Sequence, residues 1–589
     1  METRARSAQG LARAVLSRVR RRPDRVTWQA LLAYLGCALV AALVALPVVA
    51  EQAVEDVRFS DELGTFPVEV SLCHDGRSTL DTGILGKVFW DRTGAYGFGA
   101  YARAAGPPEA GGTLASYVDP EFIQANVSFI QHPDAVVAAY SEEMRSALRA
   151  RVLRDEALAA LIGGAVLFVV LPRRRLQGVR RRPTAVAAVL VVSGALGLST
   201  LAASALFAQW DCNDAAGPTY TVPEMANPTF SSPQMSEIVS QVRPFIDKNT
   251  RRIDAAADRY EDNAATSLTT ALLERAPELE PRDGEKLVLA EADTQGSYVG
   301  VAVRKTMYSQ LVEALGEDAI ALRTIAGDVT SNGTVAESDY VQAEADVAPD
   351  VPTVAVAGDH DSEKTWQQLQ EAGMTVPDLA AVDDDGFRVV GANDREHKTL
   401  FGGSVTNESG IGEIELGSRL REEVGDEGGI VVMHQPSALV GYLGLDNLTA
   451  LHELPVSGSA LTTPYDDGLE DLPPGTIDIG HLHEPAGPWV VWNTEGDAVT
   501  WTVIDQLGTA GGVENTPTFS RFSTPFSAPL KPITVRLQYV DTESGLQTGY
   551  ATVQCGIDAR CTVSGRVEVG LPGGEPGTTA RPPTTPPGG

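Results

Sequence analysis

Aspartate and histidine residues follow a series of short apolar runs in the second half of this 589-residue chain. The runs at 286–290, 320–326, 352–357, 430–433 and 477–480 lead, in that order, to Asp293, Asp328, Asp359-His360-Asp361, His434 and His481-Leu482-His483. Helical or loop stretches separate the runs, which predicts an α/β alternation whose strand ends converge on one rim. Carboxylate and imidazole groups together suit Mn, Fe or Zn.

The histidines are concentrated at these positions. Four of the eight histidines of the chain are His360, His434, His481 and His483. A His-x-His pair places both imidazoles on one side of an extended or turning backbone, so that each can bind one of two adjacent ions. The ordered series of strand ends therefore predicts a metal site.

The order of the motifs resembles that of the calcineurin-like metallophosphoesterases, in a membrane-anchored bacterial form. The family pattern D-x-H, G-D, G-N-H-D/E, H and G-H-x-H corresponds here to Asp293-Thr294-Gln295, Gly327-Asp328, Gly358-Asp359-His360-Asp361, His434 and Gly480-His481-Leu482-His483. Two positions depart from the pattern. Gln295 stands where the family has a His ligand, and Asp359 stands where it has Asn. An amide oxygen is a weaker ligand than imidazole, whereas Asp359 adds a negative charge that holds a cation more tightly.

The resemblance implies a two-sheet sandwich flanked by helices and two divalent ions, Mn, Fe or Zn. With Asp328 shared, the ligands would be Asp293, Gln295 and His483 for one ion, and Asp359, His434 and His481 for the other. The ion pair would generate a hydroxide that attacks phosphorus. His360, oriented by Asp361, would protonate the leaving oxygen.

Three apolar stretches in the first 210 residues predict transmembrane helices at 26–50, 153–172 and 184–209. Residues 1–25 carry eight Arg, and the loop 173–183 is also rich in Arg. By the positive-inside rule both segments are cytoplasmic, which makes this a multi-pass protein of the cell membrane with its main domain outside. A cleaved signal peptide ending at Ala50 is the alternative for the first stretch, and it leaves the same domains outside.

The remaining chain divides by composition. We predict a small β-rich domain outside the membrane at 51–152, a spacer and helical stalk at 210–285, the phosphoesterase domain at 286–570 and a disordered Pro/Gly/Thr tail at 571–589. Cys555 and Cys561 close a small loop between two strand-like runs and are expected to form a disulfide. A Cys73–Cys212 pair follows only by elimination.

The net charge of −32 argues against nucleic-acid binding, which needs a basic surface. The expected partners are a phosphate-ester substrate and the lipid bilayer. The predicted function is hydrolysis of a phosphomonoester or phosphodiester at the outer face of the membrane. The alternative is a catalytically degenerate phosphoesterase fold that serves as a binding or envelope-associated module, which Gln295 favours. A structural envelope protein is the third possibility.

Some other candidates have simpler interpretations. His397 and His452 fit no position of the motif series and are interpreted as surface residues. The run Asp383-Asp384-Asp385 before Gly386 could bind calcium, but a solvated turn is the preferred interpretation.

Overall fold

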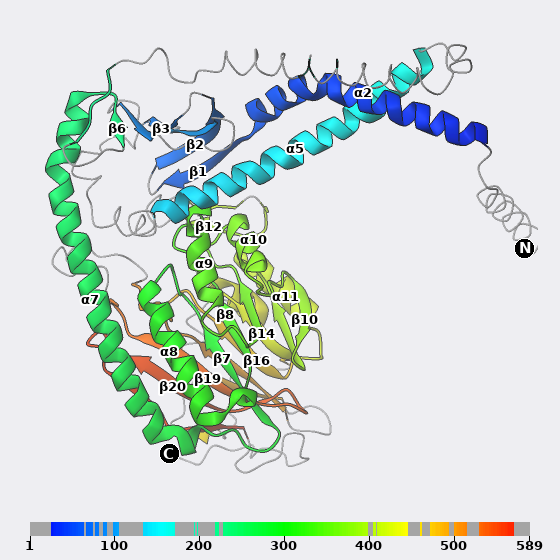
Figure 1. Ribbon diagram of the computed structural model, residues 1–589. Coiled ribbons are helices and arrows are strands. Elements are labelled where there is room, and N and C mark those ends of the chain that lie inside the picture. The colour runs from blue at the N-terminus through cyan, green and yellow to red at the C-terminus, as the bar shows by residue number, and fades with distance from the viewer. Residues whose placement is uncertain are drawn as a thin grey trace, which may run out of the picture. The chain divides into compact units, whose positions relative to one another are not determined.

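The computed structural model (Figure 1) describes most of the chain from residue 228 onward and parts of the chain before it. The described residues are 25–63, 66–74, 77–81, 86–90, 98–104, 133–170, 194, 197, 199, 218–222, 228–398, 405–407, 409–445, 460–461, 472–493, 500–514 and 529–570. They belong to two compact units, of which the first holds most of residues 1–236 and the second holds residues 237–589 with two short earlier segments. The chain is a mixed α/β protein with several mixed sheets.

The first unit contains two long helices, α2 (Arg25–Asp56) and α5 (Pro133–Val170). A six-stranded sheet in the same part of the chain has the order β1-β2-β5-β3-β4-β6. Its strands are β1 (Arg58–Leu63), β2 (Phe66–Cys73), β3 (Ser78–Asp81), β4 (Lys87–Trp90), β5 (Gly99–Ala104) and β6 (Thr229–Phe230). The sheet thus lies mainly within the stretch 51–152, and β6 joins it from beyond residue 209.

Within the described residues, one helix is apolar and long enough to cross a membrane, the stretch Leu31–Val54 of α2, and a signal sequence would pass the same test. The expectation of three such helices is therefore not met. Residues 153–170 of the second stretch are the end of α5, which begins at Pro133. Charged residues up to Glu156 leave an apolar part in α5 that is shorter than the roughly 20 residues a span needs. The third stretch, 184–209, lies almost wholly outside the described residues.

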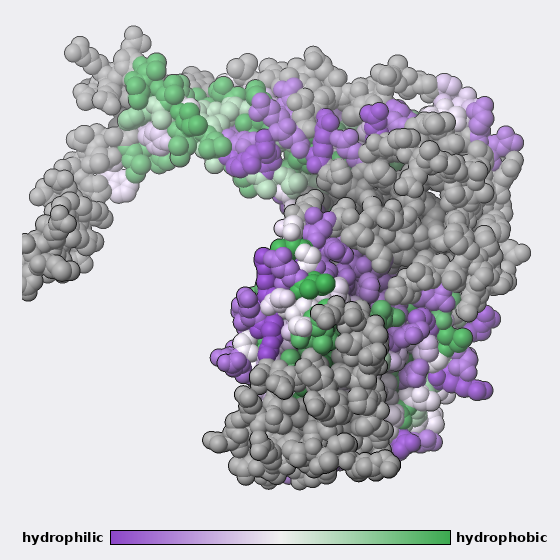
Figure 2. Space-filling model, turned by 180° about the vertical axis from the view of Figure 1, so that it is seen from behind, coloured by the Kyte–Doolittle hydropathy of each residue, from purple (hydrophilic) through white to green (hydrophobic). Residues whose placement is uncertain are grey.

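Small residues bring α2 and α5 into close contact. A Cβ added at Gly164 would lie 2.7 Å from Cα of Ala38, so only a glycine permits this approach. The Tyr34 hydroxyl donates to the Leu161 carbonyl across 3.1 Å. Figure 2 shows apolar surface gathered in this part of the molecule, where side chains such as Leu32 and Val169 are exposed.

The second unit is built on two larger sheets. One has the order β15-β22-β20-β19-β7-β8-β9, with β21 beside β20, and the other has the order β10-β11-β14-β16-β18-β17. The strands of the first are β7 (Glu285–Glu291), β8 (Ile320–Ala326), β9 (Thr353–Val356), β15 (Ala460–Leu461), β19 (Ile533–Asp541), β20 (Gln547–Cys555), β21 (Cys561–Val563) and β22 (Val567–Val569). Those of the second are β10 (Ala380–Asp384), β11 (Phe387–Gly391), β14 (Gly429–Met433), β16 (Gly475–Ile479), β17 (Ala486–Asn493) and β18 (Thr500–Gln506). A short pair, β12 (His397–Lys398) and β13 (Val405–Thr406), stands apart.

Helices connect these strands. They are α7 (Pro233–Leu279), α8 (Tyr298–Leu315), α9 (Ser338–Ala345), α10 (Glu363–Glu371), α11 (Glu413–Val424) and α12 (Pro436–Leu443), with 3-10 turns at Glu317–Ala319 and Val335–Glu337. The strands β7, β8 and β9 run parallel, as do β11, β14, β16 and β18. Every residue of β8 is buried, as expected for a central parallel strand covered on both faces. One apolar cluster joins Leu322 and Val354 of the first sheet to Val389 and Val432 of the second.

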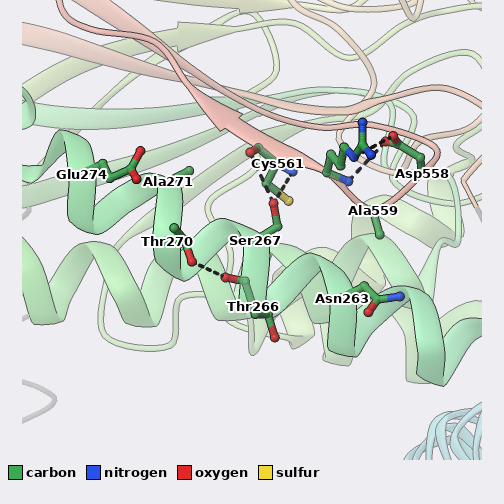
Figure 3. A pocket seen from close by; sticks show the side chains of 10 residues that line it. Asn263, Thr266, Ser267, Thr270, Ala271, Glu274, Asp558, Ala559 and Cys561 are labelled. Carbon is green, nitrogen blue, oxygen red and sulfur yellow. Dashed lines mark hydrogen bonds and ion pairs between the residues drawn. The ribbon is translucent and has the colours of Figure 1, made fainter.

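Helix α7 packs against the C-terminal hairpin that carries the Cys555–Cys561 disulfide (Figure 3). Ser267 of α7 accepts a hydrogen bond from the Cys561 amide at 2.9 Å, and the Tyr260 hydroxyl donates to the Gly556 carbonyl at 3.0 Å. The Cys555–Cys561 disulfide predicted from the sequence is confirmed. Cys73 is also disulfide-bonded, and its partner lies outside the described residues.

Candidate metal centre

The carboxyl ends of the parallel strands of both sheets in the second unit meet at one place. Asp293, Asp328 and Asp359 follow β7, β8 and β9 of the first sheet. His434 follows β14, and the pair His481 and His483 follows β16 of the second sheet. The six side chains predicted from strand ends are thereby brought together.

The backbone turns sharply at these strand ends. Asp293, Gln295, Asp328, His481 and His483 all have positive φ, between 38° and 72°. Such conformations cost a non-glycine residue of the order of 1–3 kcal/mol and occur where a site fixes them. Two neighbouring glycines make room for the cluster. A Cβ at Gly327 would lie 2.5 Å from the His434 ring, and one at Gly358 would lie 2.3 Å from the Asp328 carboxylate.

The side chains form two overlapping groups suited to hold metal ions. Asp328, Asp359, His434 and His481 form one group, and Asp293, Asp328 and His483 form the other. In each group the ligand atoms lie within 4.8 Å of one another, and Asp328 belongs to both.

Individual distances show how tightly the groups are drawn together. His434 Nε2 lies 3.2 Å from Asp328 Oδ1 and 3.3 Å from Asp359 Oδ1. His481 Nδ1 lies 3.3 Å from Asp359 Oδ1, and His483 Nε2 lies 3.4 Å from Asp293 Oδ1. Three carboxylates and three imidazoles, nearly all buried, are a donor set that fits one or two divalent transition-metal ions.

Backbone carbonyls fix the orientation of two of the imidazoles. His434 Nδ1 donates to the Ala326 carbonyl at 2.8 Å, and His483 Nδ1 donates to the Val513 carbonyl at 2.7 Å. In both rings Nε2 therefore faces the carboxylates, which is the orientation of a metal-ligating histidine once that nitrogen has lost its proton. The Asp293 carboxylate accepts from the His481 amide at 2.9 Å, and Thr509 Oγ1 donates to the Asp293 carbonyl at 2.7 Å.

Burial and mutual charge shift the pKa values of the cluster. Burial raises the pKa of Asp293 to about 7, and burial lowers the pKa of His483 to about 4. Burial also acts to raise the pKa of Asp328, but the nearby His434 charge holds it below its ordinary value. His434 is the converse case, because the Asp328 carboxylate outweighs burial and raises its pKa well above the usual range. The cluster thus requires positive charge among its carboxylates, which protons or metal ions can supply.

Gln295 lies beside the shared carboxylate of Asp328. Its Nε2 donates a hydrogen bond of 2.9 Å to Asp328 Oδ2, and the side chain is buried. In this arrangement the amide nitrogen faces the shared carboxylate, and the amide oxygen is not the atom directed at it. Gln295 therefore fixes the orientation of Asp328.

The Asp359-His360-Asp361 motif supports the loop around Asp328. The His360 amide donates to Asp328 Oδ1 at 2.9 Å, and its ring Nδ1 bonds to the Ser331 carbonyl at 3.2 Å. Asp361 accepts hydrogen bonds from the amides of Val329, Thr330 and Gly358 and from the Thr330 hydroxyl. The carboxylate of Asp361 thus holds two strand-end loops together, and the carbonyl of Ser331 is the partner of the His360 ring.

Other candidates from the sequence lie in varied places. His397 is half-buried, and its Nδ1 bonds to the Asp361 carbonyl at 2.8 Å, so that it lies beside the motif rather than on an unrelated surface. Asp385 and Gly386 form the β10–β11 turn with positive φ, in agreement with the interpretation of this run as a turn. His452 lies outside the described residues.

A second group of buried charges lies directly behind the centre. Glu291, Arg304, Arg323 and Glu344 are fully buried and pair with one another, and we call them the arginine–glutamate quartet. Arg304 contacts Glu291 at 2.7 Å, and Arg323 contacts Glu291 at 2.7 Å. Sequence patterns do not reveal this group, because charged residues in strands and helices usually face solvent.

No family model matches the chain, and no curated protein matches it in sequence.

Proposed function

We propose that the chain is a membrane-anchored, metal-dependent phosphoesterase that hydrolyses a phosphomonoester or phosphodiester at the outer face of the membrane. The observation that carries the proposal is the sharing of Asp328 by two ligand groups. A carboxylate shared in this way suits a pair of ions a few ångströms apart, the arrangement used in two-metal hydrolysis of phosphate esters. The resemblance of the motif order to the calcineurin-like metallophosphoesterases supports the same assignment.

The proposed fold is the two-sheet sandwich of that family. The apolar cluster containing Leu322 and Val432 supports it, because it draws on both large sheets. Hydrogen bonds also join the two sheets. Asp478 of β16 accepts one from Gln538 of β19 at 2.6 Å and one from Thr324 of β8 at 3.4 Å.

The proposed topology anchors the chain through α2, whose stretch Leu31–Val54 is apolar and long enough to cross a membrane. The exposed apolar side chains at the end of α5 and its close contact with α2 support a position of this helix end beside the anchor. The Arg-rich loop 173–183 supports its orientation. A disulfide in the second unit agrees with an oxidising compartment outside the cytoplasm.

The roles of the protein groups follow from their contacts. Two divalent ions held by Asp293, Asp328, Asp359 and the three histidines would supply a nucleophile at neutral pH and neutralise charge on the phosphoryl oxygens. His360 has Nδ1 directed at the Ser331 carbonyl, so that Nε2 is the atom that can hold a proton for the leaving oxygen. Asp361 keeps the loops that carry Asp328 and His360 in place.

The second candidate is a degenerate phosphoesterase fold that binds metal or an envelope ligand without turnover. The hydrogen bond from Gln295 Nε2 to Asp328 favours it, because it removes one expected ligand from the ion of the Asp293 group. A site with one firmly bound ion would still stabilise the fold.

The test uses the full chain, purified in detergent without chelator and supplied with Mn²⁺. An aryl phosphomonoester and an aryl phosphodiester serve as substrates for the wild type, Asp328→Ala and His434→Ala. The control is Asp385→Ala in the exposed β10–β11 turn. We expect turnover in the wild type and the control and its loss in both site variants. Bound metal without turnover on either substrate would favour the binding module, and a folded protein that binds no metal would refute the phosphoesterase and any metal-binding role of the module.

A further inference from the structure

A loop next to the metal centre carries a buried carboxyl that no predicted role uses. Asp394 follows β11, and β11 pairs in parallel with β14, so the loop and His434 leave the sheet at the same edge. The Asp394 amide donates to the Ala357 carbonyl at 3.0 Å, and Asn393 Oδ1 accepts from the Ala357 amide at 2.7 Å. Ala357 stands two residues before Asp359. The loop is therefore held beside the centre by two hydrogen bonds to the backbone of Ala357, one from the Asp394 amide and one to the Asn393 side chain.

The Asp394 carboxylate is buried without a partner. Asp394 is 6% exposed, and neither its Oδ1 nor its Oδ2 has a hydrogen-bond partner among the described residues. The amide of Gln435 approaches it, but its Nε2 also completes no hydrogen bond. The charged groups that act on Asp394 are those of His434, Glu413 and Asp359.

Glu413, the first residue of α11, is a second buried carboxyl near Asp394, and one of its two oxygens has no hydrogen-bond partner among the described residues. It is 3% exposed. Its Oε1 accepts from the amides of Arg395 and Glu396 at 2.8 and 3.0 Å, which fixes the side chain under the loop. Its Oε2 has no partner in the described part of the chain. Three carboxylate oxygens, two from Asp394 and one from Glu413, are thus buried and unpaired.

Among the residues that the structure describes, no arginine forms an ion pair with Asp394 or Glu413. The Arg395 guanidinium, the nearest along the chain, points instead to Asp378 at 2.7 Å. A buried carboxylate without a cation is strongly unfavourable. Protonation would remove the charge, but it would leave an O–H donor and carbonyl oxygens still without partners, which is also unfavourable in a buried place. A bound cation satisfies both requirements at once.

We propose that Asp394 and Glu413 hold a divalent cation at a site separate from the aspartate–histidine centre. The ligands at this site are oxygens alone, which favours a hard cation of the Mg²⁺ or Ca²⁺ class with water completing its coordination. The centre, with its three imidazoles, favours transition metals. The cation neutralises the carboxyls beside His434 and ties the β11 loop to the first turn of α11.

The experiment counts cations on the full chain in detergent. Protein preloaded with Mn²⁺ is dialysed against Ca²⁺ or Mg²⁺, and each bound metal is measured by mass spectrometry. The wild type is expected to take up one further cation per chain. Asp394→Asn and Glu413→Gln are each expected to weaken that uptake at least tenfold. Asp293→Asn, in the ligand group that lacks Asp359 and His434, and Asp385→Asn, in the exposed turn, are expected to retain it.

Thermal unfolding of the same proteins provides a readout that does not depend on turnover. Ca²⁺ or Mg²⁺ should raise the unfolding temperature of the wild type and leave that of Asp394→Asn unchanged. Without cation, Asp394→Asn should be no less stable than the wild type.

Uptake that survives both Asp394→Asn and Glu413→Gln would overturn the proposal, as would the absence of any further cation at millimolar concentration. Uptake lost with Asp293→Asn would place the cation in the centre instead. An Asp394→Asn protein that fails to fold leaves the decision to Glu413→Gln and to the wild-type uptake.

Discussion

The second unit contains two adjacent regions of buried carboxylates, and the charge of these carboxylates is balanced in a different way in each region. Glu291 of the arginine–glutamate quartet and Asp293 of the metal centre are two residues apart at the end of β7. The quartet pairs two carboxylates with two guanidinium groups, and Tyr340 adds a hydrogen bond of 2.9 Å to Glu344. Burial alone would raise the pKa of Glu344, but Arg304 and Arg323 lower it to about 2.

The centre contains carboxylates and imidazoles but no guanidinium among its ligand groups. Its charge is balanced only by protons or by ions from outside, which is why burial raises the pKa of Asp293 to about 7 whereas that of Glu344 falls. A buried carboxylate that is paired with a cation of the chain therefore supports the fold, whereas a buried carboxylate that needs an external cation marks a binding site. The predictions below test that distinction.

Breaking the quartet should produce the largest loss of stability. Arg304→Met leaves Glu291 and Glu344 with one arginine in a fully buried place. We expect the free energy of unfolding to fall by about 3–5 kcal/mol, as is typical when one partner of a buried ion pair is removed. Chemical denaturation of the full chain measures it. The matched control is Arg419→Met. Arg419 forms an exposed ion pair with Glu415 at 2.5 Å, so this substitution should change the free energy of unfolding by less than about 1 kcal/mol. Equal effects of the two substitutions would contradict the distinction.

Breaking the centre should have the opposite signature. Asp293→Asn should lower turnover and Mn²⁺ affinity by more than the roughly 10–100-fold typical of residues outside the first coordination sphere. Without metal at pH 8, however, the variant should be at least as stable as the wild type. The raised pKa of Asp293 means that its contribution to stability is complete below about pH 4 and is lost as the pH rises to about 7, and asparagine avoids that loss. A metal-free Asp293→Asn protein that is several kcal/mol less stable than wild type would show that the carboxylate is structural.

The strand ends, and with them the grouping of the Asp and His side chains that could hold a metal ion, could be predicted because local sequence encodes them. An apolar run that ends in Asp or His is visible without knowledge of the fold, and parallel strands bring such ends together. Pairings between distant elements were not accessible in the same way. Arg304 of α8 and Glu344 of α9 look like surface residues of two helices, and only the packing of both on β7 and β8 buries them.

Two further features escaped prediction for related reasons. Asp394 lies in a loop without a motif, so its burial depends on the parallel pairing of β11 with β14. The role of Asp361 also depends on folding, because its four donors come from two different strand-end loops.

The two regions should also differ in their response to pH. Asp293, with a pKa of about 7, must lose a proton before it binds an ion, whereas His483, with a pKa of about 4, is already neutral above pH 5. We expect Mn²⁺ affinity to fall by about tenfold per pH unit for each displaced proton, and most steeply below pH 7, because His434 with its raised pKa must lose a proton as well as Asp293. The quartet should hold its charges throughout this range. Calorimetric titration in buffers of different ionisation enthalpy measures the proton release directly, and an affinity that does not vary between pH 5.5 and 8 would contradict the assignment.

The smallest expected change concerns Gln295, the position where the centre uses a neutral amide beside the shared carboxylate. Gln295→His replaces the hydrogen bond to Asp328 by an imidazole that can bind an ion at the Asp293 group. The backbone there has φ of 38°, which histidine adopts more readily than most residues. We expect Mn²⁺ affinity of this group to rise by roughly tenfold, at the lower end of the changes caused by altered coordination spheres.

Gln295→Ala, which removes both the amide and any ligand, is the control and should not tighten Mn²⁺ binding. If Gln295→His and Gln295→Ala weaken binding equally, the hydrogen bond that orients Asp328 matters more than an additional ligand, and the amide is then part of a functioning site rather than a sign of its decay.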